Sequence, residues 1–187
     1  MLTIVGGRFR RALLAQPTTA VTRPTAQRTR AAIFNILSHN SDLSLVGANA
    51  IDVFAGSGAL GLEALSRGAT HVTFVEQHPE AMQALKQNVH KLGAESLCTL
   101  LTLSVQRLPQ ATQPVDLVFI DPPYHENLET PTLEILHTRG WLHSKTTIVM
   151  ETSATSQWTP PPAFHILDER RYGAARIAFY SLLRDKS

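Results

Sequence analysis

Two short stretches of the sequence carry residue types that could hold a ligand and react with it. The first is residues 50–65, where Asp52 lies inside an apolar run and three glycines follow in the spacing Gly56-x-Gly58-x-x-Gly61. This spacing fits a dinucleotide-binding turn, which is a weak signal by itself. Asp52 is more informative, because a carboxylate in a buried strand needs a partner to offset its lost hydration. We interpret it as part of a pocket for a cationic ligand such as S-adenosylmethionine; the alternative is a cap on backbone N–H groups of the turn.

The second stretch is Asp121-Pro122-Pro123-Tyr124, which follows an apolar, strand-like run. Two prolines stiffen the loop and lack N–H donors, so the Asp121 carboxylate and the Pro122 carbonyl form an acceptor-only corner. Such a corner suits an NH₂ group on a nucleobase, and Tyr124 adds an aromatic face for stacking. Two fixed acceptors favour a pyramidal nitrogen whose lone pair can attack a methyl sulfonium. The stretch predicts methyl transfer to a base amine, with Asp121 as hydrogen-bond and proton acceptor; the alternative is a rigid turn with a core tyrosine.

A third acidic residue, Glu76, ends a strand-like run and lies 20 residues after Gly56. This spacing places a carboxylate beside the ribose of a bound nucleoside, where it accepts hydrogen bonds from both hydroxyls and leaves no room for a 2′-phosphate. The alternative is a strand-end acid that is simply solvated.

Strands and helices alternate in the order needed to bring these residues together. Short apolar runs bounded by turn residues predict strands at 51–54, 71–76, 97–105, 115–120 and 147–151. Helices are predicted after the glycine turn, from Pro79 and over 125–139, with at most a helical turn at 106–111. Residues 164–171 and 176–183 are predicted to be antiparallel strands, because only a turn separates them.

This pattern predicts an α/β fold, built on a doubly wound, mostly parallel, Rossmann-like sheet of seven strands with an antiparallel C-terminal hairpin. Residues 2–14 are predicted to be a small N-terminal β-hairpin, and a helix is predicted to run from Pro24 to about His39. We divide the chain into a basic hairpin-and-helix arm, residues 1–41, and a single globular domain, residues 42–187.

The distribution of charge indicates a polyanionic partner. Residues 1–41 hold six arginines and no Asp or Glu, whereas the rest of the chain holds 11 Lys and Arg against 15 Asp and Glu. A basic arm on a mildly acidic body is typical of a protein that grips nucleic acid. The alternative is that the arginines only keep the surface soluble.

The composition of the chain excludes several classes of protein. The chain of 187 residues has no apolar run that could span a bilayer and no recognisable signal peptide. Its one cysteine, Cys98, is predicted to be buried, and one cysteine cannot form a disulfide framework. No spacing of histidines and cysteine suggests a metal site. We expect a monomeric cytoplasmic protein that binds no membrane and no metal.

These motifs resemble those of class I S-adenosylmethionine-dependent methyltransferases, and more closely the bacterial 16S ribosomal RNA guanine-N2 methyltransferases of RsmD type. The resemblance covers nearly the whole chain and rests on Ile4-Val-Gly-Gly, Arg23-Pro-Thr, Arg28-x-Arg30, Phe34-Asn35, the stretch from Asp52 to Leu65, Phe74-x-Glu76, Asp121-Pro-Pro-Tyr and Tyr172-Gly173. It implies S-adenosylmethionine as cofactor, S-adenosylhomocysteine as product, and 16S rRNA or an assembling small ribosomal subunit as partner.

The resemblance also implies roles for individual residues. The implied cofactor-binding residues are Asp52, Phe54, Gly56, Gly58, Glu76, Gln77, Ser104 and Asp121. The implied catalytic residues are Asp121, Pro122 and Tyr124, and the implied RNA-binding residues are Arg10, Arg23, Arg28 and Arg30. Two positions depart from the family pattern: Ser104 replaces the usual Asp or Asn near the adenine, and Ala31 replaces an acid after the Arg-x-Arg pair.

Two other functions remain open. A DNA methyltransferase acting on adenine N6 or cytosine N4 would use the same acceptor corner, although this short chain shows no large target-recognition region. A non-catalytic RNA-binding module would keep only a vestigial cofactor pocket, and the weaker hydrogen bonding of Ser104 is its one support.

Overall fold

The computed structural model describes residues 1–18, 24–39, 45–123 and 126–183. Seven strands form one sheet in the order β5-β4-β3-β6-β7-β9-β8. The parallel strands are β3 (Asn49–Val53), β4 (His71–Val75), β5 (Cys98–Leu101), β6 (Leu117–Ile120) and β7 (Thr147–Ser153). The antiparallel hairpin consists of β8 (Phe164–Tyr172) and β9 (Ala175–Leu182), with β9 paired to β7. The predicted fold class is therefore confirmed.

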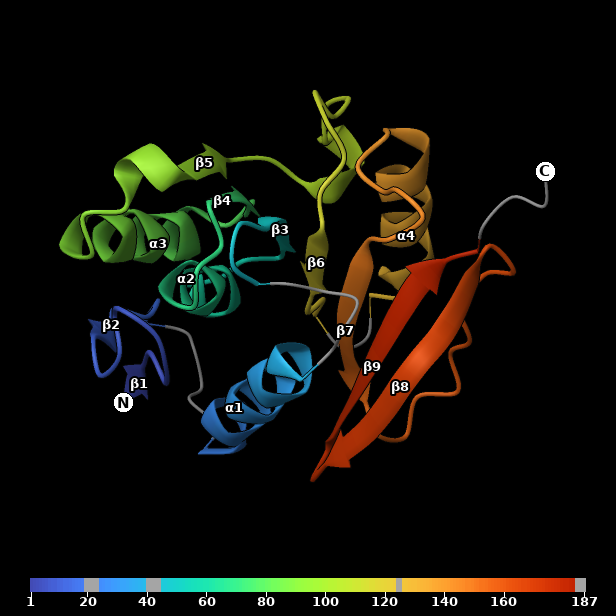
Figure 1. Ribbon diagram of the computed structural model, residues 1–187, viewed down its shortest axis with the longest axis horizontal. Helices are drawn as coiled ribbons and strands as arrows, with labels where there is room; N and C mark the ends of the chain where they lie inside the picture. Colours follow the sequence, from blue (N-terminus) through green and yellow to red (C-terminus); the bar gives the residue numbers. More distant parts are fainter. Residues whose placement is uncertain (19–23, 40–44, 124–125, 184–187) are drawn as a thin grey trace.

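Helices cover both faces of this sheet (Figure 1). The helices α1 (Pro24–Ser38), α2 (Ala59–Ser66) and α3 (Pro79–Lys91) pack on one face, and α4 (Glu129–Thr138) packs on the other. Successive strand residues point to opposite faces, so Ala50 joins the core under α1–α3 and Ile51 joins the core under α4. A strand covered on both faces is apolar throughout, which explains the continuous apolar runs.

Two element boundaries and the burial of one residue differ from the sequence-based prediction. α4 begins at Glu129, after Asn127 with φ 49°, a left-handed value that a right-handed helix cannot include. β5 ends where its pairing with β4 ends, at Leu101, and one turn of 3₁₀-helix, η2 (Val105–Arg107), follows. Cys98 is half-buried rather than buried, because β5 is an edge strand.

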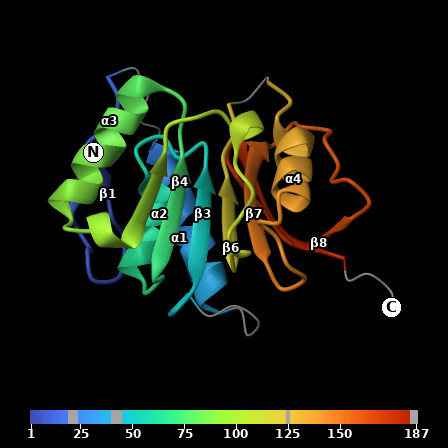
Figure 2. The same cartoon turned by 90° about the horizontal axis from the view of Figure 1, so that it is seen from above.

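The N-terminal residues belong to the face that α1–α3 cover. The hairpin is short, with two residues in each of β1 (Leu2–Thr3) and β2 (Leu13–Leu14). Ile4 and Leu14 are buried in the same core as Phe34 of α1. Figure 2 shows the hairpin beside α3, at the end of the sheet far from β8. The predicted division at residue 41 lies outside the described residues and stays a prediction.

Among the helices described above, none is long and apolar enough to cross a membrane.

Candidate active site

The acidic residues singled out above lie at one edge of the sheet. Asp52 pairs with Phe74 of β4 on one side and with Phe119 of β6 on the other. Glu76 directly follows β4, and Asp121 directly follows β6. Because the strand order reverses between β3 and β6, this edge is the switch point at which open α/β sheets bind ligands. Asp52 and Asp121 therefore lie at the same edge, as expected.

The three glycines of the turn between β3 and α2 are required for different structural reasons. Gly56 and Gly58 both adopt left-handed φ values, 56° and 81°. A methyl group on Gly58 would lie 2.4 Å from Leu85, and one on Gly61 would lie 2.4 Å from the Phe74 ring. A methyl group on Gly56 would meet nothing within 4 Å. Gly58 and Gly61 thus permit close packing of the turn, whereas Gly56 faces open space that a ligand can enter.

This difference predicts that alanine at Gly56 acts mainly on cofactor binding, whereas alanine at Gly61 acts mainly on stability. Gly56→Ala should fold, at a cost of about 1–2 kcal/mol for its left-handed backbone, and should weaken S-adenosylhomocysteine binding by about tenfold or more. Gly61→Ala should destabilise the protein by about 1–3 kcal/mol, because the Phe74 ring must shift. Thermal unfolding and isothermal titration measure both quantities. Unchanged cofactor affinity in Gly56→Ala would show that the cofactor does not approach this position.

Asp52 is buried at the base of this turn, with 2% of its surface exposed. Its Oδ2 accepts a hydrogen bond from the N–H of Gly61 at 2.8 Å, so the alternative role as a cap is present in the structure. Burial raises the pKa of the Asp52 carboxyl to about 8; the Gly61 bond opposes this shift, and the nearby Glu76 carboxylate adds to it. A cationic ligand beside Asp52 would favour its ionised form.

The raised pKa of Asp52 predicts how stability depends on pH. Folding favours the protonated carboxyl, because the folded-state pKa lies above the ordinary value of 3.8. This contribution is fully present below about pH 4 and is lost as the pH rises through about 8, with a slope of at most ~1.4 kcal/mol per unit. Urea unfolding without cofactor, from about pH 5 to 9, should show Asp52→Asn gaining stability relative to the unsubstituted protein. Parallel curves would contradict the raised pKa.

Glu76 connects the glycine turn to the start of α3. Its Oε2 accepts from the N–H of Gly56 at 2.7 Å, and its Oε1 accepts from the N–H of His78 at 2.8 Å. Each carboxylate oxygen has two lone pairs, so both can also accept from ribose hydroxyls. The Glu76 carboxylate at Gly56 and the Asp52 carboxyl at Gly61 suit a nucleoside with a positive charge and disfavour a phosphate, so the residues present fit S-adenosylmethionine.

The other implied cofactor residues lie at the same edge, and their roles stay predictions. Phe54 adopts φ 65° directly after β3 and packs partly against the core under α4. Gln77 is exposed directly after Glu76. Ser104 is half-buried after β5, and its carbonyl accepts from the N–H of Arg107 at the start of η2.

The Asp-Pro-Pro loop presents its acid to solvent on a buried support. Asp121 is exposed and Pro122 is buried. Burial of the Pro122 ring fixes the backbone that carries both Asp121 and the Pro122 carbonyl. Tyr124 lies outside the described residues, so its stacking role stays a prediction.

The four arginines implied to bind RNA have different environments. Arg10 and Arg28 are exposed, and Arg23 lies outside the described residues. The structure contradicts the prediction for Arg30, which is 3% exposed and donates to the carbonyl of Thr3. Its Nε lies 3.7 Å from Oε2 of Glu63, and burial lowers its pKa. A phosphate cannot reach a guanidinium that is enclosed in this way.

Sequence reasoning missed two buried polar residues near the turn, Glu63 of α2 and Asn88 of α3. Glu63 is fully buried and accepts from the N–H groups of Val5 and Gly6 at 2.7 and 2.8 Å. Asn88 is 1% exposed and bonds to the backbone of Ala15. Each is a polar residue on an otherwise apolar helix face, and this pattern could have indicated that it is buried with a hydrogen-bond partner.

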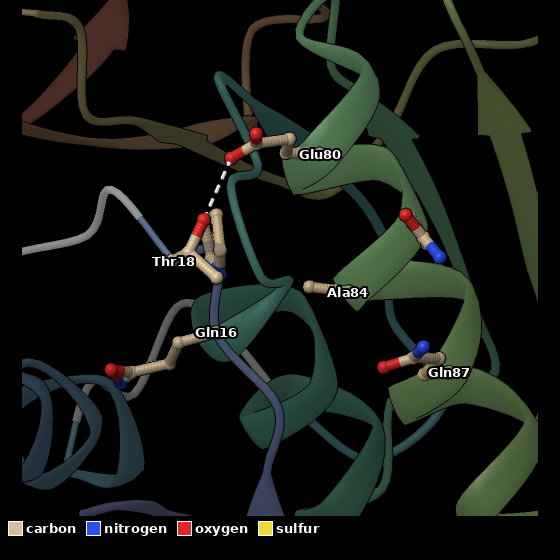
Figure 3. A pocket seen from close by; sticks show the side chains of 7 residues that line it. Gln16, Thr18, Glu80, Ala84 and Gln87 are labelled. Atoms are coloured by element: carbon tan, nitrogen blue, oxygen red, sulfur yellow. Dashed lines mark hydrogen bonds between the residues drawn. The ribbon is translucent and has the colours of Figure 1, made fainter.

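Two further features bear on ligand binding. A hollow lies between the segment of residues 16–18 and α3, lined by Gln16, Pro17, Thr18, Glu80, Gln83, Ala84 and Gln87 (Figure 3). Within the described ranges, no group of three or more His, Cys, Asp or Glu side chains is placed to hold a metal ion.

The fold and the site together define the class of the protein. The solved structure of magnesium protoporphyrin IX methyltransferase from Synechocystis, with bound S-adenosylmethionine, matches with a TM-score of 0.63 over 85% of this chain and 80% of that one. At 15% identity this match shows the fold alone. The two carboxylates beside the glycine turn at the switch point fit the same cofactor. Together with the family matches that follow, they identify the chain as a class I S-adenosylmethionine-dependent methyltransferase.

Closer matches define the family. The model of the family described as conserved hypothetical protein 95 matches residues 2–181. Ribosomal RNA small subunit methyltransferase D of Escherichia coli is 35% identical over 178 residues, covering 95% of this chain and 87% of that protein. Its namesake in Haemophilus influenzae is 33% identical over 165 residues, covering 84% and 82%. The solved structure of Escherichia coli yhhF has a TM-score of 0.83 at 33% identity, covering 96% and 97%. The chain belongs to the RsmD family of methyltransferases.

Proposed function

We propose that this protein transfers a methyl group from S-adenosylmethionine to the exocyclic N2 amine of a guanine in 16S ribosomal RNA during assembly of the small subunit. One observation carries this proposal. In a chain of the RsmD family, the glycine turn with Asp52 and Glu76 lies at the same edge of the sheet as the hydrogen-bond acceptors of Asp121 and Pro122. The names of the relatives from Escherichia coli and Haemophilus influenzae support the RNA substrate.

Of the residues at this edge of the sheet, some bind the cofactor and others act on the guanine amine. Bound S-adenosylmethionine supplies a methyl group on a positively charged sulfur. Asp52 and Glu76 hold the charged and hydroxyl-bearing parts of the cofactor beside Gly56. The Asp121 carboxylate and the Pro122 carbonyl accept hydrogen bonds from the two N–H groups of the guanine amine, which aims its lone pair away from both acceptors. Asp121 then takes up the proton that the amine loses.

Mass mapping of modified nucleotides tests the reaction. Small subunits that lack the modification are incubated with the protein and labelled donor, and duplex DNA is treated in parallel. We expect N2-methylguanosine at one position of 16S rRNA and no label in DNA. Label on adenine N6 or cytosine N4 of DNA would support the alternative amino-methyltransferase, and binding without turnover would support the non-catalytic module.

The exposed arginines of the arm are proposed to contact RNA phosphates. Arg28→Ala should weaken binding to small subunits at low salt and reduce the slope of log affinity against log salt by about 1. Arg171→Ala is the matched control, because Arg171 is also exposed but lies on β8 at the far end of the sheet. Equal effects of the two substitutions would show that RNA affinity depends on the total charge of the protein and not on the position of the arginine in the arm.

We further propose that the protein acts in the cytoplasm, where small subunits assemble, and that it acts as a monomer. Gel filtration with light scattering tests the second point, with a mass near 20.5 kDa as the expected result.

A further inference from the structure

Asn88 of α3 is a buried polar residue that the proposed chemistry does not use. Its Oδ1 accepts from the N–H of Ala15 at 2.6 Å, and its Nδ2 donates to the carbonyl of Ala15 at 3.0 Å. The same Nδ2 donates to the carbonyl of Ser57 at 2.9 Å. Ser57 lies between the two left-handed glycines of the turn, so one side chain joins the N-terminal segment directly to the cofactor turn.

The segment that Asn88 holds runs along the length of α3. Lys91, at the end of the helix, donates to the carbonyl of Leu13 at 2.9 Å. Thr18 donates to Glu80, in the first turn of the helix, at 3.2 Å. Figure 3 shows this segment beside α3, with the bond between Thr18 and Glu80. Because α3 begins just after Glu76, the segment leads from the hairpin toward the edge that holds the active site.

Asn88 differs from the other ties between this segment and the body. The contacts made by Lys91 and Glu80 are exposed and do not involve the glycine turn. Glu63 holds the backbone of residues 5 and 6, but none of its hydrogen bonds reaches the turn. Within the described part of the chain, the hydrogen bonds of Asn88 join both the N-terminal segment and the glycine turn.

A buried amide in this position penalises independent movement. If the turn shifts relative to the segment, Nδ2 of the buried Asn88 side chain loses one of its two carbonyl acceptors, and a buried hydrogen-bonding group left without a partner is costly. The position of residue 15 and the conformation of the turn are therefore favoured together.

We propose that Asn88 is a positioning residue that couples occupancy of the cofactor turn to placement of the RNA-binding arm. This inference rests on the proposed function, because it takes the turn to bind S-adenosylmethionine and the arm to bind RNA. A cofactor that holds Ser57 in the conformation bonded to Asn88 strengthens RNA binding, and RNA strengthens cofactor binding by the same factor.

The test measures the affinity for S-adenosylhomocysteine, which transfers no methyl group, with and without unmodified small ribosomal subunits. In the unsubstituted protein the subunits should tighten binding by about fivefold or more. Asn88→Asp keeps the size and the Oδ1 acceptor but replaces the donor with an oxygen that faces two carbonyls. In this variant the effect should fall below about twofold. Lys91→Ala, which removes a tie between the segment and the same helix, should keep the full effect.

A second measurement needs no substitution and decides the matter if Asn88→Asp does not fold. S-adenosylhomocysteine should slow hydrogen exchange of the Ala15 N–H, which donates to Asn88, more than that of the Arg11 N–H, which donates to the carbonyl of Ile4. Equal slowing at both amides, or full coupling in Asn88→Asp, would overturn the inference. Binding of both ligands without coupling overturns only this inference, whereas binding of neither overturns the proposed function as well.

Discussion

Replacing Asp121 with alanine is expected to lower the rate of methyl transfer by about 10²–10³-fold, which is the usual effect of removing one group that stabilises a transition state. The substitution removes the carboxylate acceptor and leaves only the Pro122 carbonyl to orient the guanine amine. Asp121 is exposed, so folding and RNA affinity should change little. The turnover rate at saturating donor and small subunits, together with the two dissociation constants, measures these effects.

Glu126 provides the matched control for Asp121, because it is an exposed acid that follows the same proline pair. Glu126→Ala should leave turnover within about twofold of the unsubstituted protein. A loss in Asp121→Ala that appears only as weaker donor binding would assign Asp121 to the cofactor rather than to the amine. Turnover that is unchanged in Asp121→Ala would remove the acceptor corner from the mechanism.

Replacing Glu63 with alanine is expected to cause the largest loss of stability. Besides the two backbone N–H groups of the arm, Glu63 accepts from Nε of Arg67 at 2.8 Å and lies 3.7 Å from Nε of Arg30. Arg30 is itself buried, so removal of Glu63 leaves a buried cation without its partner. Breaking a buried pair in this way costs about 3–5 kcal/mol.

For a chain of this size, that cost corresponds to a fall in Tm of about 6–20 °C in thermal unfolding. Glu134→Ala is the control, because Glu134 is an exposed acid on α4, and its Tm should change by less than about 2 °C. A comparably small change in Glu63→Ala would mean that the buried network contributes no net stability.

The alternating strands and helices of the fold were predictable, because the apolar pattern and the residues that begin and end each element agree there. α3 begins at Pro79, where a proline fits the first helical position, and its end precedes Gly93, which adopts a left-handed φ of 59°. The parallel strands read as continuous apolar runs because helices cover both faces of the sheet. The order of the last two strands was not predicted, although the sequence carries a signal for it: β8 has four consecutive charged residues, Asp168 to Arg171, as suits an edge, whereas β9 is almost entirely buried.

The environment of Arg30 was not predictable from helical spacing. The spacing places a residue on a face of the helix, but it does not say what covers that face. Here Thr3 and Glu63 cover it, one 27 positions earlier and the other 33 positions later in the chain. The same limit applies to Asn88, whose partners Ala15 and Ser57 are 73 and 31 positions away.

A crystal structure with bound S-adenosylhomocysteine tests most directly whether the glycine turn and the Asp-Pro-Pro loop form one active site. We predict that the ribose hydroxyls contact Glu76, that the amino-acid part lies beside Gly56, and that the sulfur faces Asp121 and Pro122. A cofactor whose sulfur points away from Asp121, or which occupies the hollow between residues 16–18 and α3, would contradict this account.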